Sequence, residues 1–396
     1  MNCRTELPDK EHCTGCQACR LACPVKAISM LENEHGHIYP FINEDICICC
    51  NKCAKTCPEF TPVNLCSDKQ VYALWTNDSS IRKYSTSGGA SYILSRKIVE
   101  RQGYFCGVEY KDNEAIHTIC NDVASLHRYQ GSKYMHSDVK NVYAEIENLL
   151  KEGKTVLFTG TPCQVAGLRS YLRKEYENLY CIDLVCHGVP SRRIKRDRIE
   201  YIEKANNKKV VDLRFREKKP DQHNTHTKYT FSDGSSISQS VYYDEMFRCF
   251  VSNHALRDNC FNCRYATGER CGDITISDFW GYVPAHIRYI SYQKGTSMVL
   301  VNNSKGKYLL NLIKDECTID DQRTFQEAAE CNRNLYSPQP KPEKYDEFWS
   351  EYLSGKSIEE LAPEYYPVKV YKTPFKRKVK LTIKLLLPKS IIKLIK

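Results

Sequence analysis

The sequence predicts a protein of mixed α+β and α/β class, in which a small cysteine-rich module precedes an α/β domain with a mixed sheet. Eight of the 22 cysteines form two runs of identical spacing within residues 13–57, and these runs mark the module. Beyond them, apolar segments of strand length alternate with segments of helical periodicity, which is typical of an α/β domain. A chain of 396 residues is also too long to fold around a single core.

The composition is that of a globular protein whose cysteines stay reduced. It is 41% hydrophobic and 27% charged, which excludes a disordered or fibrous chain. No apolar run approaches the roughly 18 residues of a membrane-spanning helix, and the N-terminal residues lack the apolar stretch of a secretory signal. We therefore expect a cytoplasmic protein whose cysteines bind metal or carry out redox chemistry instead of forming disulfides.

The net charge of +10 comes from the C-terminal tail. Residues 369–396 hold nine Lys, one Arg and no Asp or Glu, so residues 1–368 sum to zero. A neutral body argues against nucleic acid as a partner, because a groove that follows phosphates needs clustered cations. Lysines in the tail alternate with Leu and Ile, and two interpretations stay open. One is a peripheral contact with anionic lipid on the inner face of the membrane, and the other is a solvated basic tail with a short helix.

The strongest motif is a pair of cysteine runs, at residues 13–24 and 47–58, each with the spacing C-x2-C-x2-C-x3-C-P. This spacing is typical of two-cluster bacterial ferredoxins, in which the fourth cysteine of one run ligates the cluster of the other run. One predicted 4Fe–4S cluster is held by Cys13, Cys16, Cys19 and Cys57. The other is held by Cys47, Cys50, Cys53 and Cys23. A pair of zinc sites is the alternative, but zinc does not need four cysteines in each run.

The segment after the module carries a weaker signal. A Ser/Gly-rich turn at residues 85–90 opens a helix that ends before Gly103, and such a turn either cradles phosphate with its backbone N–H groups or only caps the helix. A hairpin is predicted over residues 103–120. Ser137 is then expected to cap a helix with one apolar face.

Two strand-to-helix units follow, and each has a cysteine at the end of its strand. A strand at 155–158 leads through Cys163 into a helix at 164–174, and a strand at 180–185 leads through Cys186 into another helix. Because the carboxyl ends of parallel strands lie at one edge of a sheet, we expect these two cysteines to converge there.

A third cysteine motif, Cys260-x2-Cys263, needs two more ligands to complete a tetrahedral or cubane site. Cys163 and Cys186 are candidates from the sheet, and Cys271 is a competitor close in the chain. A zinc knuckle, or thiols that are simply buried, are the alternatives.

With these segments in this order, the chain resembles the coenzyme F-420 hydrogenase/dehydrogenase beta-subunit family. The motifs that carry the resemblance lie within residues 70–300 and are STSGGA, QGSKY, FTGTPCQVAGLRSYL, IDLVCHGVPS, CFNCRY and GDITISDFWG. The two-cluster module in front is similar to the bacterial branch of the family, which often accompanies polysaccharide-biosynthesis proteins.

The resemblance implies a flavoprotein domain that carries FAD and its own 4Fe–4S cluster. The residues that would lie near the flavin are Ser87, Gly88, Gly89, Gly131, Ser132, Lys133 and Thr161. The third cluster would be held by Cys163, Cys186, Cys260 and Cys263, with Cys271 competing for the fourth place. Apart from the resemblance, we expect His187, which follows Cys186, to donate a proton to the substrate; the alternative is a turn residue that bonds backbone.

The predicted organisation has four parts: a ferredoxin module (1–66), the N-terminal part of the flavoprotein domain (67–150), its C-terminal part with the third cluster site (151–340), and a helical and basic tail (341–396). The predicted function is that of an iron–sulfur, flavin-dependent oxidoreductase serving polysaccharide biosynthesis. It would exchange electrons with a ferredoxin or reductase and with a small-molecule acceptor. The alternative is an electron-transfer subunit without a substrate of its own. The sequence does not distinguish coenzyme F-420 from other acceptors.

Overall fold

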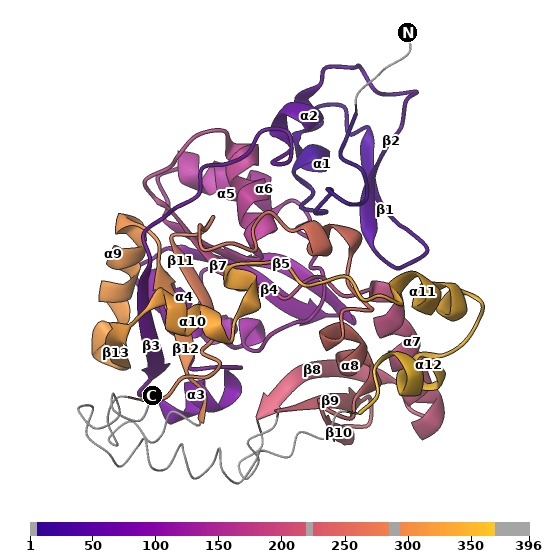
Figure 1. The fold of residues 1–396 in the computed structure, drawn as a ribbon. Coiled ribbons are helices and arrows are strands. Elements are labelled where there is room, and N and C mark those ends of the chain that lie inside the picture. Colours follow the sequence, from indigo (N-terminus) through magenta and orange to yellow (C-terminus); the bar gives the residue numbers. More distant parts are fainter. Residues whose placement is uncertain (1–5, 219–224, 285–293, 369–396) are drawn as a thin grey trace.

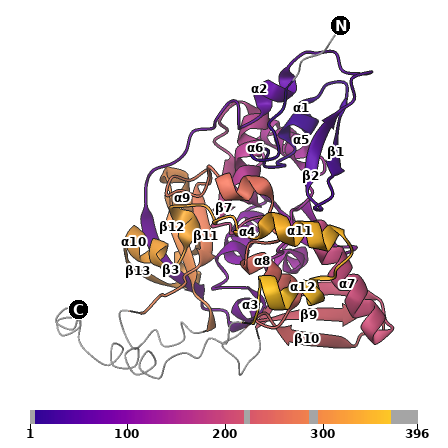
Figure 2. The same cartoon turned by 45° about the vertical axis from the view of Figure 1, so that its right-hand side comes forward.

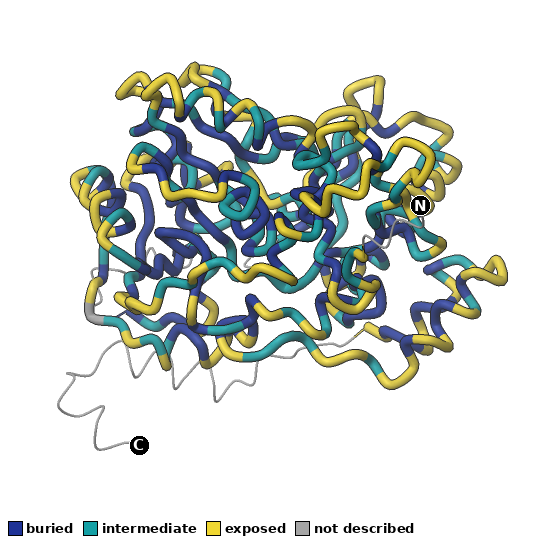
Figure 3. Tube along the Cα trace, turned by 90° about the horizontal axis from the view of Figure 1, so that it is seen from above, coloured by how far each residue is buried: buried dark blue, intermediate teal, exposed yellow. Residues whose placement is uncertain are grey.

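In the computed structural model, residues 6–218, 225–284 and 294–368 are described. The N-terminal module lies at one end, next to a large central sheet, and a smaller sheet with its own helices lies beside it (Figures 1 and 2). Burial is concentrated in the central strands and helices, while outer loops are exposed (Figure 3). The mixed α/β class that the sequence predicts is confirmed.

The two cysteine runs of the module fold in the same way. Each contains a short helix, α1 (Ala18–Ala22) or α2 (Lys52–Thr56), and the residue before each helix is left-handed, with φ of 66° at Gln17 and 56° at Asn51. The left-handed residue turns the chain sharply, so the cysteines before and within the helix face the same space. Between the runs, β1 (Ile28–Glu32) and β2 (Ile38–Ile42) form an antiparallel pair.

The central sheet has eight strands in the order β13-β3-β12-β11-β7-β6-β4-β5. The neighbours among β4, β6, β7 and β11 are parallel, and the outer pairs are antiparallel, so the sheet is mixed. The strand bounds are β3 (Gln70–Thr76), β4 (Tyr104–Lys111), β5 (Glu114–Cys120), β6 (Val156–Gly160), β7 (Leu179–Leu184), β11 (Ile274–Asp278), β12 (Ser297–Val301) and β13 (Cys317–Arg323). Strands from both predicted parts of the flavoprotein domain therefore share one sheet.

Helices cover both faces of the central sheet. On one face, α4 (Ala90–Glu100) and α9 (Ser304–Ile313) pack over alternate strand residues such as Leu157. On the other face, α5 (Val142–Lys151) and α6 (Pro162–Leu172) pack over Phe158, and α6 also contacts α1 of the module. The shorter helices are α3 (Ser79–Tyr84), α10 (Phe325–Glu330) and the 3-10 turns η1 (Ala124–Tyr129), η2 (Asp258–Asn262), η4 (Lys314–Glu316) and η5 (Arg333–Leu335).

The smaller sheet is an antiparallel β10-β9-β8 arrangement with a core of its own. Its strands are β8 (Val210–Lys218), β9 (Thr225–Phe231) and β10 (Ser236–Ser240). The helices that share its core are α7 (Arg192–Asn206), α8 (Glu245–Val251), α11 (Tyr345–Leu353) and α12 (Ile358–Tyr365). Residues up to 368 thus belong to the folded body.

One predicted element is wrong. The helix expected from Ser137 begins at Val142, with Asn141 before it. Asp138 forms a backbone bridge to β5 instead, and the Ser137 hydroxyl lies 3.0 Å from Nδ1 of buried His117. Pairing with the sheet edge therefore replaces the expected cap.

The membrane contact predicted for the basic tail concerns residues 369–396, which lie outside the described residues. Within the described ranges, no helix is both long and apolar enough to cross a membrane.

Candidate iron–sulfur sites and the adjoining cavity

The first thiol set contains the cysteines predicted for the first N-terminal cluster: Cys13, Cys16, Cys19 and Cys57. Burial raises the pKa of the Cys19 thiol well above its ordinary value, and the other three thiols raise it further. The three members from the first run are enclosed, at 8%, 7% and 9% exposed. The structure therefore brings these four thiols together in a shielded place.

The second thiol set contains Cys23, Cys47, Cys50 and Cys53. Burial raises the pKa of Cys53, and the thiols of Cys23 and Cys47 raise it further. Cys50 is exposed, and so are the apolar side chains of Ile46 and Ile48, at 47% and 60%. The two runs share one local geometry, but the first faces the body of the protein and the second faces solvent.

The third thiol set contains cysteines from three distant segments: Cys163, Cys186, Cys260 and Cys263. Burial raises the pKa of Cys186 well above its ordinary value, and the other three thiols of the set raise it further. The backbone N–H of Val189 also donates a hydrogen bond to Cys260 Sγ at 3.3 Å. The set lies where β6 and β7 end, so the structure brings the strand-end cysteines together with the downstream pair.

Cys271 lies beside this set but is held in the core. Its backbone N–H donates to Asp183 Oδ2 at 3.1 Å, and Arg270 pairs with the same carboxylate at 3.3 Å. Its side chain is 0% exposed and packs in the apolar cluster between the sheet and α6. Burial is the largest cause of the raised pKa of Cys271. The charge of Asp183 raises this pKa further, and Cys163 contributes less than Asp183 does. Cys271 is not among the thiols that raise the pKa of Cys186, Cys163 or Cys260, and on this ground we place it outside the third thiol set.

The donors of all three sets fit iron–sulfur clusters, which are held by thiolates. Among the described residues, no group of three or more His, Cys, Asp or Glu side chains is arranged around a single metal ion. A cubane distributes four thiolates over four iron atoms. Its ligands therefore need not approach one another as closely as those of one tetrahedral Zn²⁺, which lie about 3.8 Å apart.

A buried cation between the first and third sets supports the same assignment. Arg257 is 0% exposed, and its Nη2 has no hydrogen-bond partner among the described residues. Its Nε donates to the carbonyl of Cys13 at 2.8 Å, while its backbone carbonyl accepts from the N–H of Cys260 at 2.9 Å. A charged guanidinium in such a place fits a negatively charged group that is not part of the polypeptide.

The module is fixed to the body through α6. Ser170 of this helix donates to the carbonyl of Thr56 at 2.7 Å, and Tyr143 donates to the carbonyl of Cys16 at 3.2 Å. Burial raises the pKa of Cys16 to about 12, and the thiols of Cys57 and then Cys163 contribute to that rise. The first and third sets are therefore neighbours across the beginning of α6.

A cavity of about 2200 Å³ opens next to the third set, and Cys186 is part of its wall. Pockets for single small molecules measure about 300–1,000 Å³, so this space accommodates a large cofactor together with a second ligand. Six of the seven residues that the resemblance places near a flavin line it: Ser87, Gly89, Gly131, Ser132, Lys133 and Thr161. Gly88 is not among the residues that line the cavity. It packs against β3, where a Cβ atom on it would lie 2.3 Å from the carbonyl of Leu74.

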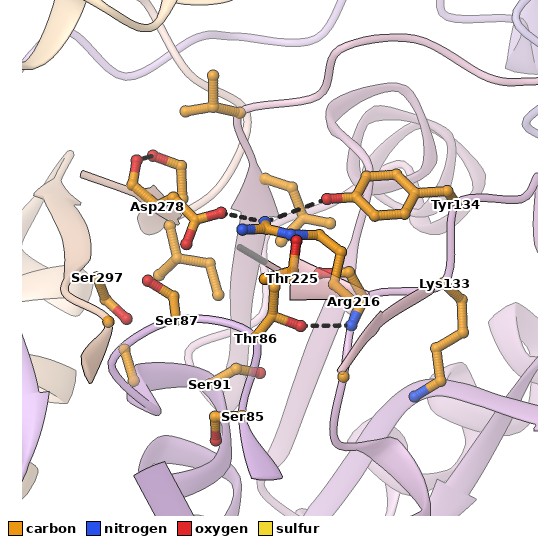
Figure 4. A pocket seen from close by; sticks show the side chains of 18 of the residues that line it. Ser85, Thr86, Ser87, Ser91, Lys133, Tyr134, Arg216, Thr225, Asp278 and Ser297 are labelled. Carbon is orange, nitrogen blue, oxygen red and sulfur yellow. Dashed lines mark hydrogen bonds and ion pairs between the residues drawn. The ribbon is translucent and has the colours of Figure 1, made fainter. Parts of the chain in front are cut away.

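The Ser/Gly-rich turn meets the cavity at the start of α4. Gly89, with φ of 95°, precedes this helix, and no side chain caps its first N–H groups. Thr86 in the turn accepts a hydrogen bond from the N–H of Ser132 at 2.7 Å, which ties the turn to the loop of Lys133 (Figure 4). Uncapped N–H groups at a helix start, with lysine nearby, form a setting for phosphate.

Cations dominate the cavity wall. Among the described lining residues there is one carboxylate, Asp278, and seven lysines or arginines: Arg82, Lys83, Lys133, Arg216, Lys218, Arg248 and Lys294. Arg216 projects between Asp278 and Tyr134, forms an ion pair with the former and donates to the Tyr134 hydroxyl at 3.3 Å (Figure 4). Burial lowers the pKa of Lys133 to about 7 and that of Lys218 to about 8.

Two predicted residues have partners of their own in the cavity wall. The Thr161 hydroxyl lies 3.2 Å from Cys163 Sγ and 3.0 Å from Gln164 Oε1, in the capping box that starts α6. The ring of His187 makes an edge-to-face contact with Phe250, and burial lowers the pKa of His187. Its Nε2 is buried and has no hydrogen-bond partner among the described residues.

Three important residues had no signal in the sequence: Arg216, Lys218 and Arg257. Arg257 is a single cation in its segment, and Arg216 and Lys218 stand among other charged residues at 212–219. Only the packing of distant segments buries these three side chains. A spacing rule cannot identify such a residue.

Fold and thiol sets together define an electron-transferring iron–sulfur protein of the oxidoreductase type. Residues 12–60 match the family model of a 4Fe–4S dicluster domain. Residues 153–324 match the model for the C terminus of the coenzyme F420 hydrogenase/dehydrogenase beta subunit. These two matches confirm the resemblance that the sequence motifs indicate.

No curated protein matches the chain. Among solved structures, a chain of the F420-reducing NiFe hydrogenase complex from Methanosarcina barkeri is similar. It is 14% identical, with a TM-score of 0.45, and the match covers 68% of this chain and 91% of that one.

Proposed function

We propose that the protein is an iron–sulfur flavoenzyme that passes electrons between 4Fe–4S clusters and an organic two-electron acceptor or donor by way of FAD. The observation that carries this proposal is the double position of Cys186. It belongs to the third thiol set, and it also forms part of the cavity wall. A redox ligand in the cavity would therefore lie beside the iron–sulfur site with no further layer of protein between them.

The cavity has the parts that a dinucleotide flavin needs. The proposed contacts are the turn with Ser87 and Gly89, the loop with Gly131, Ser132 and Lys133, and Thr161 at the start of α6. Uncapped N–H groups and lysines would hold the diphosphate. Bound FAD would supply the conversion between single electrons and two-electron chemistry.

The cations also favour an anionic acceptor. Seven basic side chains against one carboxylate exceed what one diphosphate requires, and the cavity is large enough for a second ligand. The proposal includes two further roles: service to polysaccharide biosynthesis, and donation of a proton to the substrate by His187. The exposed second set is where we place contact with a ferredoxin or reductase.

Iron and flavin analysis of anaerobically purified protein tests this function. We expect about twelve irons and one flavin per chain. C186S should retain the flavin and hold about eight irons, because it removes one ligand of the third set and leaves the N-terminal sets intact. Protein with a full complement of iron but no flavin, and no flavin binding on addition of FAD, would contradict the proposal. It would favour the alternative, an electron carrier without its own substrate.

We further propose that the basic tail contacts anionic membrane surfaces. Its ten cations would each contribute about 1 kcal/mol close to such a surface. Deletion of residues 369–396 should abolish cosedimentation with vesicles that contain phosphatidylserine and leave the absorption spectrum unchanged. Cosedimentation of the truncated protein would exclude this role of the tail.

A further inference from the structure

Arg257 is a fully buried cation without a carboxylate partner. No described Asp or Glu forms an ion pair with it, and its side chain is 0% exposed. Three other arginines whose side chains are at most 8% exposed have such a partner: Arg198 with Glu245, Arg216 with Asp278, and Arg270 with Asp183. Because an unpaired buried charge is strongly destabilising, Arg257 requires a counter-charge that the described residues do not supply.

The contacts that Arg257 does make are with dipoles. Nε donates to the carbonyl of Cys13 at 2.8 Å, and Nη1 donates to the carbonyl of Ile38 at 2.7 Å. The guanidinium carbon lies 3.9 Å from the centre of the Tyr39 ring. These partners orient the group but leave its net charge uncompensated, and Nη2 has no partner among the described residues.

Arg257 reaches the first and third thiol sets at once. Its backbone N–H donates to the carbonyl of Val189 at 3.0 Å, and its own carbonyl accepts from the N–H of Cys260. The backbone is thus fixed at the third set, while the side chain extends to the first.

A glycine makes this approach possible. A Cβ atom on Gly15, which has φ of 70°, would lie 3.1 Å from Arg257 Nη1 and 2.7 Å from the ring of His136. The equivalent position of the second run is Cys49, with φ of 54°, in the exposed loop of the second set. The loop of the first run is therefore the one shaped to receive the guanidinium.

We propose that Arg257 uses the negative charge of the first and third clusters as its counter-ion and raises the reduction potentials of both, but not that of the second. It is a positioning residue, because it acts through the clusters and not on a substrate. A fixed cation stabilises the state with one more electron, so it raises the potential. Electrons that enter at the exposed second set would then be drawn inwards.

The test is a redox titration of the holoprotein followed by electron paramagnetic resonance, in the wild type and in R257M, R257K and R264M. The signals are assigned with the ligand variants C16S, C50S and C186S. In R257M we expect the first and third clusters to shift to lower potential. At a fixed ambient potential their ratio of reduced to oxidised form should fall about tenfold, or about 59 mV for a one-electron couple. The second cluster should not shift, and R257K should restore most of the change.

Arg264 is the matched control. It directly follows Cys263 in the chain and donates to the carbonyl of Pro58 at 3.0 Å, but it is exposed and pairs with Glu59. R264M should therefore leave all potentials close to those of the wild type.

Either of two results supports the proposal. One is a shift of the potentials of the first and third clusters in R257M without a shift of the second. The other is loss of the first and third clusters in R257M and their retention in R257K. Unchanged potentials, equal shifts of every cluster, or loss of iron in R257M and R257K alike would overturn it. The third cluster rests on the proposed function, whereas the first rests on the N-terminal cysteine runs. If the wild type holds only about eight irons, the proposed function fails, and the shift of the first cluster relative to the second still decides the role of Arg257.

Discussion

Gly167 of α6 and Cys16 of the first cysteine run are in direct contact. A Cβ atom on Gly167 would lie 2.9 Å from Cys16 Cβ and 3.1 Å from its Sγ. A glycine within a helix lowers helix stability by about 1 kcal/mol relative to alanine. At this position the glycine allows α6 to approach Cys16 closely. The helix that begins beside Cys163 thereby packs directly on the loop of the first set.

We expect G167A to displace the first run, because neither the helix nor the thiol can move aside without disturbing a ligand set. The variant should lose about four irons and keep the second cluster, as measured by iron analysis and electron paramagnetic resonance. S170A, one turn along the same helix, removes the hydrogen bond to Thr56 without adding volume and should keep its iron. A full set of cluster signals in G167A would show that this contact is not required.

The third set predicts which cysteines can be replaced. C263S should lose about four irons, whereas C271S should keep them, because Cys271 is buried in the apolar cluster against α6 and is not among the thiols that raise the pKa of Cys186. The measurements are iron content and the visible absorption that the clusters give to anaerobic protein. Equal losses in both variants would place Cys271 among the ligands and contradict the geometry.

How much of this site the sequence predicts depends on how local the pattern is. The N-terminal sets follow from spacing, since each run turns around a left-handed residue and supplies three ligands of one set and the fourth ligand of the other. The meeting of Cys163 and Cys186 follows from the rule for strand ends. The choice between Cys263 and Cys271 does not, because it depends on a carboxylate in β7 that is distant in the chain.

The remaining differences have the same origin. The helix expected at Ser137 begins later, because Asp138 pairs with β5, and such pairing has no local signature. Arg216 and Arg257 gain their roles from burial between segments that are far apart in the chain. Composition reports their charge but not their surroundings.

The lysines of the cavity predict a pH dependence of anion binding. Burial lowers the pKa of Lys133 to about 7 and that of Lys218 to about 8, so both are charged at pH 6 and mostly neutral at pH 9 in the ligand-free protein. We expect flavin-free protein to bind FAD about tenfold more weakly at pH 9 than at pH 6, as measured by flavin fluorescence. The unfolded chain retains these protons to a pKa of about 10.4, so the two groups also contribute stability that rises with pH between about 7 and 10.

Substitutions separate this effect from other titrations. K133Q should flatten the dependence of FAD binding on pH, whereas K83Q, which removes an exposed lysine of the same cavity, should preserve it. Wild-type affinity that does not change between these pH values would contradict the assignment of the lysines to the anion.

The ion pair of Arg216 and Asp278 predicts a specific pattern of stability. R216M leaves the Asp278 carboxylate without its partner at 17% side-chain exposure, and we expect a loss of about 2 kcal/mol in the free energy of unfolding. That is less than a fully buried pair would lose, because the cavity admits water. R216M/D278N should recover about half of the loss, since the second substitution removes the stranded charge.

R214M, two residues earlier on β8, breaks a surface pair with Asp212 and should cost under about 0.5 kcal/mol. Urea denaturation of the four proteins measures these differences. A double variant no more stable than R216M would show that Arg216 stabilises the cavity wall through its contacts with Tyr134 and Trp280, and not through its charge.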